Sequence, residues 1–167
     1  NALGNLGSAY RSLGNYGKAI EYHEQSLAIK REIKDRRGEE TALGSLGLAY
    51  GILGNYSKAI EYHEQSLAIA REIKDRLGEG ISLNNLGVAL FKSGNLTAAA
   101  KTLMESIVTW EALRQTGAGN DANKVSIFEQ QARTYRTLQK VLVAQNQPDV
   151  ALEIAERGRA RAFVELL

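Results

Sequence analysis

Residues 14–36 read GNYGKAIEYHEQSLAIKREIKDR, and residues 54–76 read GNYSKAIEYHEQSLAIAREIKDR. The two stretches are identical except for a Gly-to-Ser and a Lys-to-Ala exchange, and they start 40 residues apart. Self-similarity at a fixed period of this length is the signature of a repeat protein. The period therefore decides the fold, because such repeats stack on their neighbours in chain order.

Weaker copies of the same unit follow. A third copy keeps the 40-residue spacing at Leu86-Gly87, Gly94-Asn95 and Ala99. A fourth aligns only after a step of 52 residues, at Leu138, Leu142, Asn146 and Ala151. We therefore expect three units and a divergent fourth: 1–36, 37–76, 77–116, a loop over 117–123, and a long hairpin over 124–167.

Each unit has the pattern of two helices joined by a short turn. In the second unit the apolar residues of the first helix recur at helical spacing, at Leu43, Leu46, Tyr50 and Leu53. Gly54-Asn55 then ends that helix, because both residues tolerate the left-handed cap conformation. A second helix follows to about Ile73, and no stretch alternates with the period of a strand.

A glycine recurs inside each first helix, at Gly7, Gly47 and Gly87. A helix-interior glycine costs ~1 kcal/mol relative to alanine, so its recurrence indicates a steric need. We expect the two helices of a unit to cross there, with the small residue Ala59, and its equivalents Ala19 and Ala99, on the opposing helix for the same reason. One unit cannot bury its own apolar stripe, whereas stacked units can. The predicted fold is an all-α right-handed superhelix with a concave groove.

The C-terminal part departs from this regularity. A long helix is expected from about Asn123 to Gln145, and Pro148 suits the first turn of a final helix. The repeat pattern is already under way at Asn1, so we expect the chain to be part of a longer protein.

Composition excludes several classes of function. The net charge is only +2, which gives no reason to expect nucleic acid as a partner. Cysteine is absent, and no apolar run approaches the ~18 residues of a membrane span. No nucleophile–base pair, metal-ligand set or phosphate loop is visible, so the prediction is a cytoplasmic non-enzyme without cofactor, metal or membrane partner.

One resemblance covers about two thirds of the chain. The pattern Leu-Gly-x-x-Tyr, then Gly-Asn-Tyr, then Ala, carried by residues 6–19 and 46–59, resembles the tetratricopeptide repeat (TPR) family. Residues 86–99 carry it with Leu90 in place of Tyr. The 40-residue unit is similar to the subclass found in LGN-type adaptors and kinesin light chains, which bind partner peptides in the groove. This resemblance implies a binding scaffold.

A second resemblance concerns the C-terminus. Residues 124–128, KVSIF, and 151–167, ALEIAERGRARAFVELL, resemble bacterial, notably cyanobacterial, TPR–CHAT proteins. There a similar segment precedes a caspase-like CHAT domain, so the resemblance implies such a domain beyond Leu167. CHAT catalysis is implied to use a His–Cys pair, and this chain has no cysteine.

The TPR resemblance also implies which residues line the groove, since the first helix of each unit supplies most of the lining. The matching positions are Ser8, Arg11, Thr41, Leu48, Ile81, Asn84, Val88, Phe91, Arg133, Arg136 and Lys140. The chaperone-type carboxylate clamp is absent, because its Lys and Asn positions hold Gly4/Gly44 and Ser8/Leu48.

This groove is apolar in its middle and basic toward the fourth unit. It predicts a protein or peptide ligand with apolar and acidic residues. Two alternatives stay open: the apolar residues pack under a neighbouring helix, and the basic residues form a solvated face partly neutralised by Glu129.

Other candidate sites have simpler interpretations. His23 and His63 recur in identical contexts, so we expect each to fill the same slot between helices instead of forming a shared metal or catalytic site. The last helix carries Arg157, Arg159 and Arg161, which we expect to pair with Glu153, Glu156 and Glu165 or to dock a following domain.

The function hypotheses are therefore three. The first is a peptide-binding scaffold that regulates or targets a larger protein. The second is a sensor of a small signalling peptide, as in bacterial TPR-based quorum sensors. The third is a structural array that self-associates through exposed repeat ends.

Overall fold

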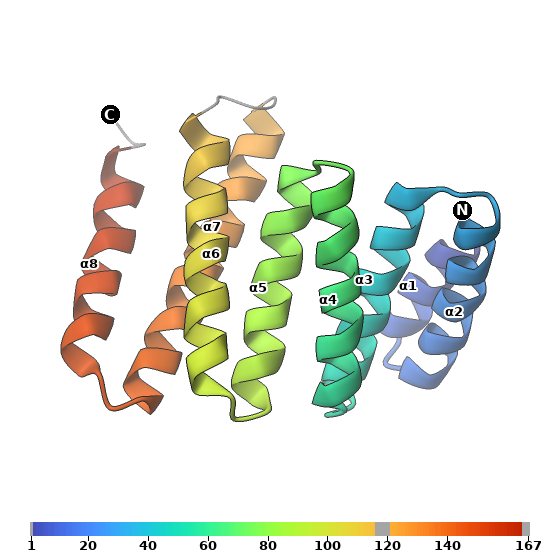
Figure 1. The fold of residues 1–167 in the computed structure, drawn as a ribbon, viewed down its shortest axis with the longest axis horizontal. Coiled ribbons are helices and arrows are strands. Elements are labelled where there is room, and N and C mark those ends of the chain that lie inside the picture. The colour runs from blue at the N-terminus through green and yellow to red at the C-terminus, as the bar shows by residue number, and fades with distance from the viewer. Residues whose placement is uncertain (1, 116–120, 165–167) are drawn as a thin grey trace.

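The computed structural model describes residues 2–115 and 121–164, with side chains described over 2–115 and 126–159. Within these residues the chain forms eight helices and no strand, and the helices lie side by side in a row from the N-terminus to the C-terminus (Figure 1). Their bounds are α1 Ala2–Ser12, α2 Tyr16–Glu32, α3 Arg36–Ile52, α4 Tyr56–Glu72, α5 Arg76–Lys92, α6 Leu96–Gln115, α7 Asp121–Ala144 and α8 Pro148–Val164.

The turns inside the units follow from two residues at each break. Gly54 has φ +77°, which confirms the predicted left-handed helix end. Asn55, predicted only as part of the helix end, also caps α4: its side chain accepts a hydrogen bond from the Lys58 backbone N–H at 3.2 Å. Between units, Asp75 caps α5 in the same way and accepts from the Gly78 N–H at 2.9 Å.

The array is curved, with the first helices on its inner side. Among the described residues, the backbones of α1 and α3, of α3 and α5, and of α5 and α7 come within 8 Å of each other, measured between Cα atoms, whereas no two of the second helices α2, α4, α6 and α8 do; these meet only through long side chains. Helices that approach one another across units lie on the inside of a curve. The first helices therefore form the concave layer, as the repeat pattern predicts.

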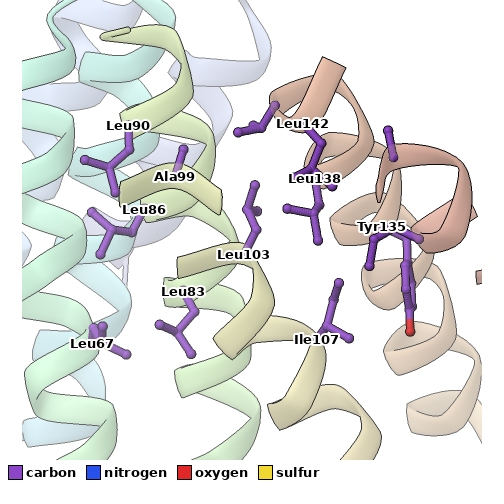
Figure 2. Close-up of a cluster of buried hydrophobic side chains, with 13 residues drawn as sticks. Leu67, Leu83, Leu86, Leu90, Ala99, Leu103, Ile107, Tyr135, Leu138 and Leu142 are labelled. Carbon is purple, nitrogen blue, oxygen red and sulfur yellow. The ribbon is translucent and has the colours of Figure 1, made fainter. Parts of the chain in front are cut away.

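The core is shared between units. Leu67 of α4 packs with Leu83 and Leu86 of α5, so the second helix of one unit covers the first helix of the next. In Figure 2 this cluster continues through Leu103 and Ile107 to the C-terminal hairpin, where Leu138, Leu142 and Tyr135 lie. The irregular fourth unit therefore continues the same hydrophobic core.

The glycine of each first helix is required by packing, as predicted. An added Cβ on Gly47 would lie 2.5 Å from Cε1 of His63, so the imidazole ring occupies the space that the glycine leaves. The same holds for Gly7 and His23, whereas Leu103 takes this place against Gly87. Ala59, one turn before His63, is fully buried on the opposing helix, as expected, and lies opposite Gly51.

The C-terminal hairpin gives two corrections. Pro148 begins α8, as expected. Of the predicted loop over 117–123, residues 117–120 lie outside the described residues, and residues 121–123 already belong to α7, so the loop was predicted to end too late. Arg157 was expected to pair within its own helix, but it donates to both carboxylate oxygens of Glu111 on α6, at 3.0 and 2.9 Å. The side chain of Arg161 lies outside the described residues.

Candidate functional site

The concave face contains a pocket of about 200 Å³ between α3 and α5, with α4 behind it. Leu48 and Val88, both predicted as groove residues, lie on opposite sides of it. Leu48 remains 37% exposed and Ile52, one turn further along α3, 51% exposed. The full lining is Gly47, Leu48, Gly51, Ile52, Tyr56, Ala59, His63, Asn85, Val88, Ala89 and Lys92.

The pocket is apolar within and polar at one side. Its polar groups on α5 are Asn85 and Lys92, and Lys92 is exposed. Among the residues that the structure describes, the Lys92 ammonium makes no ion pair. The pocket can therefore take an apolar group and place a carboxylate beside that ammonium.

His63 forms part of the wall without adding charge. It is only 2% exposed, and burial lowers the pKa of its imidazole to about 4. The ring is therefore neutral at physiological pH. No group of three or more His, Cys, Asp or Glu residues that could hold a metal occurs in the described part of the chain, and the interpretation of His23 and His63 as packing residues is confirmed by their contacts with Gly7 and Gly47.

Two predicted groove residues are partly or wholly built into the protein. Asn84 is only 9% exposed and accepts a hydrogen bond from the Thr134 hydroxyl at 3.0 Å, which ties α5 to α7. We therefore remove it from the candidate site, because its side chain joins two first helices. Phe91 is half-buried and packs against the core cluster, as one of the open alternatives held.

The other predicted residues of units one to three lie at the surface of the first helices. Ser8, Thr41 and Ile81 are exposed, and the Thr41 hydroxyl donates to the Arg37 carbonyl of its own helix. Arg11 is half-buried. The pKa of His23 is lowered mainly by burial of its ring and, to a smaller extent, by the positive charge of Arg11.

The basic residues of the fourth unit share one helix. Arg133, Arg136 and Lys140 are all exposed on α7, at spacings that keep them on neighbouring turns. The predicted neutralisation by Glu129 is not found: within the described residues none of the three makes an ion pair. The Arg136 Nε donates only to the Ala132 carbonyl, at 3.3 Å.

Sequence reasoning missed Ile52 and Lys92, although both stand one helical turn after a predicted groove residue. Extending the face of Leu48 and Val88 by four residues would have found them. It could not have found Tyr56, which belongs to the second helix and lines the pocket from behind.

A second hollow, of about 400 Å³, lies between α4, α5 and α6, away from the first pocket. Four of its charged groups pair with one another: Arg71 donates to Glu79 at 3.0 Å and to Glu105 at 3.4 Å, and Arg76 also pairs with Glu79. The two pairs of Arg71 join α4 to α5 and α6, so we assign these paired charges to the packing of consecutive units.

Comparison with known proteins supports the assignment of helical repeats. Residues 1–72 and 38–112 match the family model described as tetratricopeptide repeat. Tetratricopeptide repeat protein 28 of mouse and of human is 39% identical over 72 residues, which is 43% of this chain and 3% of that protein. The chain therefore spans only a small part of these relatives.

Two solved structures show the same fold. RapI in its apo form superposes with a TM-score of 0.82 at 18% identity, over 98% of this chain and 55% of RapI. A Podosopora anserina putative kinesin light chain with nearly identical TPR-like repeats has a TM-score of 0.57 at 19% identity, over 95% of this chain and 92% of that one. In the described part of this chain, no helix combines the length and apolar character needed to cross a membrane.

Proposed function

Since the chain belongs to the tetratricopeptide repeat family, we propose that it is a protein- or peptide-binding scaffold whose concave face holds an extended or helical segment of a partner. The observation that carries this proposal is the open apolar pocket formed by Leu48, Ile52 and Val88 on the concave layer. Apolar side chains left open in a concave site are typical of binding surfaces. The proposal assigns no catalytic role to any residue.

The ligand is a segment with apolar anchors and acidic residues directed toward α7. Support comes from the exposed cations Arg133, Arg136 and Lys140, which make no ion pairs among the described residues. Exposed cations attract acidic segments and direct their orientation. An acidic end therefore lies along α7 when the apolar anchor lies between α3 and α5.

The test uses random 12-residue peptides displayed on phage and selected against this chain. Selected peptides are then measured by fluorescence anisotropy. Leu48→Asp and Arg136→Glu should each weaken binding by at least tenfold, since they place a carboxylate at the apolar and basic parts of the face. Ala68→Asp, at an exposed position of α4, is the matched control and should change nothing. Unchanged affinity in both groove variants would refute the assignment.

Self-association is the second candidate, favoured by one observation. Leu6 on α1 is 43% exposed, whereas its equivalents Leu46 and Leu86 are buried beneath the preceding unit. We propose that this open end binds another unit of the same kind. Light scattering tests it: a monomer at the highest soluble concentration would exclude self-association through this end.

The proposal for the protein to which this chain belongs rests on the C-terminal resemblance alone. We propose a cytoplasmic bacterial parent protein in which the scaffold regulates or targets a CHAT domain. The sequence of the complete gene tests this directly, because a His–Cys pair of the CHAT type must then follow Leu167. A helix-turn-helix DNA-binding domain upstream of the repeats would instead favour the signalling-peptide sensor.

A further inference from the structure

One residue that lines the pocket between α3 and α5 differs in size from its equivalents in the other units. Gly51 lines it, and an added Cβ there would meet only the Ala59 Cβ, at 3.7 Å, which is an ordinary contact. Unlike Gly47, Gly51 is thus not required by helix packing. Its absence of a side chain leaves space on the concave side.

The equivalent positions of the neighbouring units carry large side chains. Forty residues earlier the chain has Arg11, and forty residues later it has Phe91. Both are half-buried, and Phe91 packs against the core cluster, which includes Ala99, the equivalent of Ala59. The protein itself therefore shows what fits this place in the repeat: the ring of a phenylalanine or the stem of an arginine.

The residues around Gly51 favour an apolar ligand side chain over an arginine. Leu48 and Ile52 are apolar where the first unit has Ser8 and Ser12. The cation of a ligand arginine would meet the Lys92 ammonium, whereas a ligand carboxylate would pair with it. Since the buried His63 is neutral, the inner wall offers no charge to an ionic group.

From this we infer that the Gly51 pocket is a specificity site for one aromatic or large aliphatic side chain of the partner, with a carboxylate next to it held by Lys92. This inference rests on the proposed function and deepens it. It commits the ligand to a phenylalanine- or leucine-sized anchor with an adjacent Asp, Glu or C-terminal carboxylate. A volume of about 200 Å³ accommodates one such side chain.

The test uses a small probe of the pocket alone, so that it does not depend on finding the natural partner. The ¹⁵N-labelled chain is titrated with N-acetyl-L-phenylalanine and with its amide, while the backbone amide signals of Gly51 and Val88 are followed by NMR. We expect saturable shifts at about millimolar concentration, as for other ligands of this size. The acid should bind several-fold more tightly than the amide, and Lys92→Gln should remove that difference.

Two variants copy side chains that the repeat already accepts. Gly51→Phe and Gly51→Arg place the residues of units three and one into the pocket, and both should abolish the shifts while the helical circular dichroism is retained. Ala68→Phe, which adds the same ring to an exposed position of α4, is the matched control and should bind the probe normally. If the Gly51 variants fail to fold, Val88→Asp serves instead and should weaken probe binding, because it places a carboxylate in the apolar lining, one helical turn before Lys92, without adding bulk.

The results separate the pocket from the groove. Absence of shifts in the unmodified chain, or equal binding by the Gly51→Phe chain, would overturn the pocket assignment. Selected peptides that lose affinity with Leu48→Asp and Arg136→Glu but keep it with Gly51→Phe would leave the groove standing and overturn the pocket. Conversely, peptides that bind with unchanged affinity to the Leu48→Asp, Arg136→Glu and Gly51→Phe chains would refute the groove, and with it the role of the pocket in partner specificity, even if the probe binds.

Discussion

Replacing Gly47 by alanine tests the packing on which the repeat depends. The new Cβ would lie 2.5 Å from His63 Cε1 and 2.7 Å from both ring nitrogens, whereas non-bonded heavy atoms of this kind rest at ~3.5–4 Å. The ring must move by about 1 Å, and it is only 2% exposed, so neighbouring side chains must move with it. Overpacking of this kind costs about 1–3 kcal/mol.

The magnitude is obtained by comparison with Gly44→Ala on the same helix. There the added Cβ would meet only the Ser66 Oγ, at 3.6 Å. Both substitutions gain the same helix propensity, roughly 1 kcal/mol, so that gain cancels in the difference between the two variants. Gly44→Ala should stabilise the chain, and Gly47→Ala should be less stable than Gly44→Ala by about 1–3 kcal/mol.

The assay is urea unfolding followed by circular dichroism, with His63→Ala added to each background. Removing the ring relieves the clash, so His63→Ala should cost less in the Gly47→Ala chain than in the unmodified one, a coupling measured by the double-mutant cycle. If the two single glycine variants agree within about 0.5 kcal/mol, or if the cycle shows no coupling, the steric account of the repeat glycine is wrong.

Three further predictions concern stability. Burial, and secondarily a nearby aspartate, raise the pKa of Glu40 to about 7. The stability that its neutral form contributes is therefore full below pH ~4.5 and is lost as the pH rises through 7. In urea unfolding, the stability of Glu40→Gln relative to the unmodified chain should increase by up to about 3 kcal/mol between pH 5 and pH 8, and a constant difference would contradict this. Leu46→Ala should cost about 2–5 kcal/mol, and Leu6→Ala, at the equivalent but 43% exposed position, less than 1; equal losses would show that another unit covers α1 in solution. Arg157→Ala should lower the free energy of unfolding by about 1 kcal/mol, because it removes the ion pair with Glu111 on α6, and 1 M NaCl should reduce this loss. If the variant loses no stability at low salt, the ion pair does not stabilise the fold.

The fold could be predicted from the sequence because the repeat carries redundant information. Apolar positions such as Leu43 and Leu46 and the break at Gly54-Asn55 all recur, so each supports the same assignment. What the repeat could not reveal was which atoms meet. Gly47 and Ala59 share a period, and the period alone does not distinguish His63 from Ala59 as the glycine's neighbour. Which of the two lies against Gly47 depends on how α4 is rotated about its axis relative to α3, and a sequence period does not determine that rotation.

The candidate site could be predicted only in part, for a related reason. A helical face predicts which side chains share a direction, and this placed Leu48 and Val88 correctly on one surface. It did not reveal that Asn84 is buried against Thr134, since that hydrogen bond spans 50 residues and involves the divergent unit. It also gave no signal for the Arg157–Glu111 pair, which joins α8 to α6.

The contrast between Gly47 and Gly51 explains where specificity can arise in such an array. Position 47 and its equivalents face another helix of the same unit, so a change there requires a compensating change in the chain itself, and the glycine is kept in all three regular units. Position 51 faces open space on the concave layer, and its equivalents are Arg11 and Phe91. An added Cβ at position 51 would make only an ordinary contact with Ala59, at 3.7 Å, so helix packing restricts the choice of residue much less there than at position 47. We therefore expect a substitution at this position to change which side chain the groove accepts, with a smaller effect on the scaffold than a substitution at position 47.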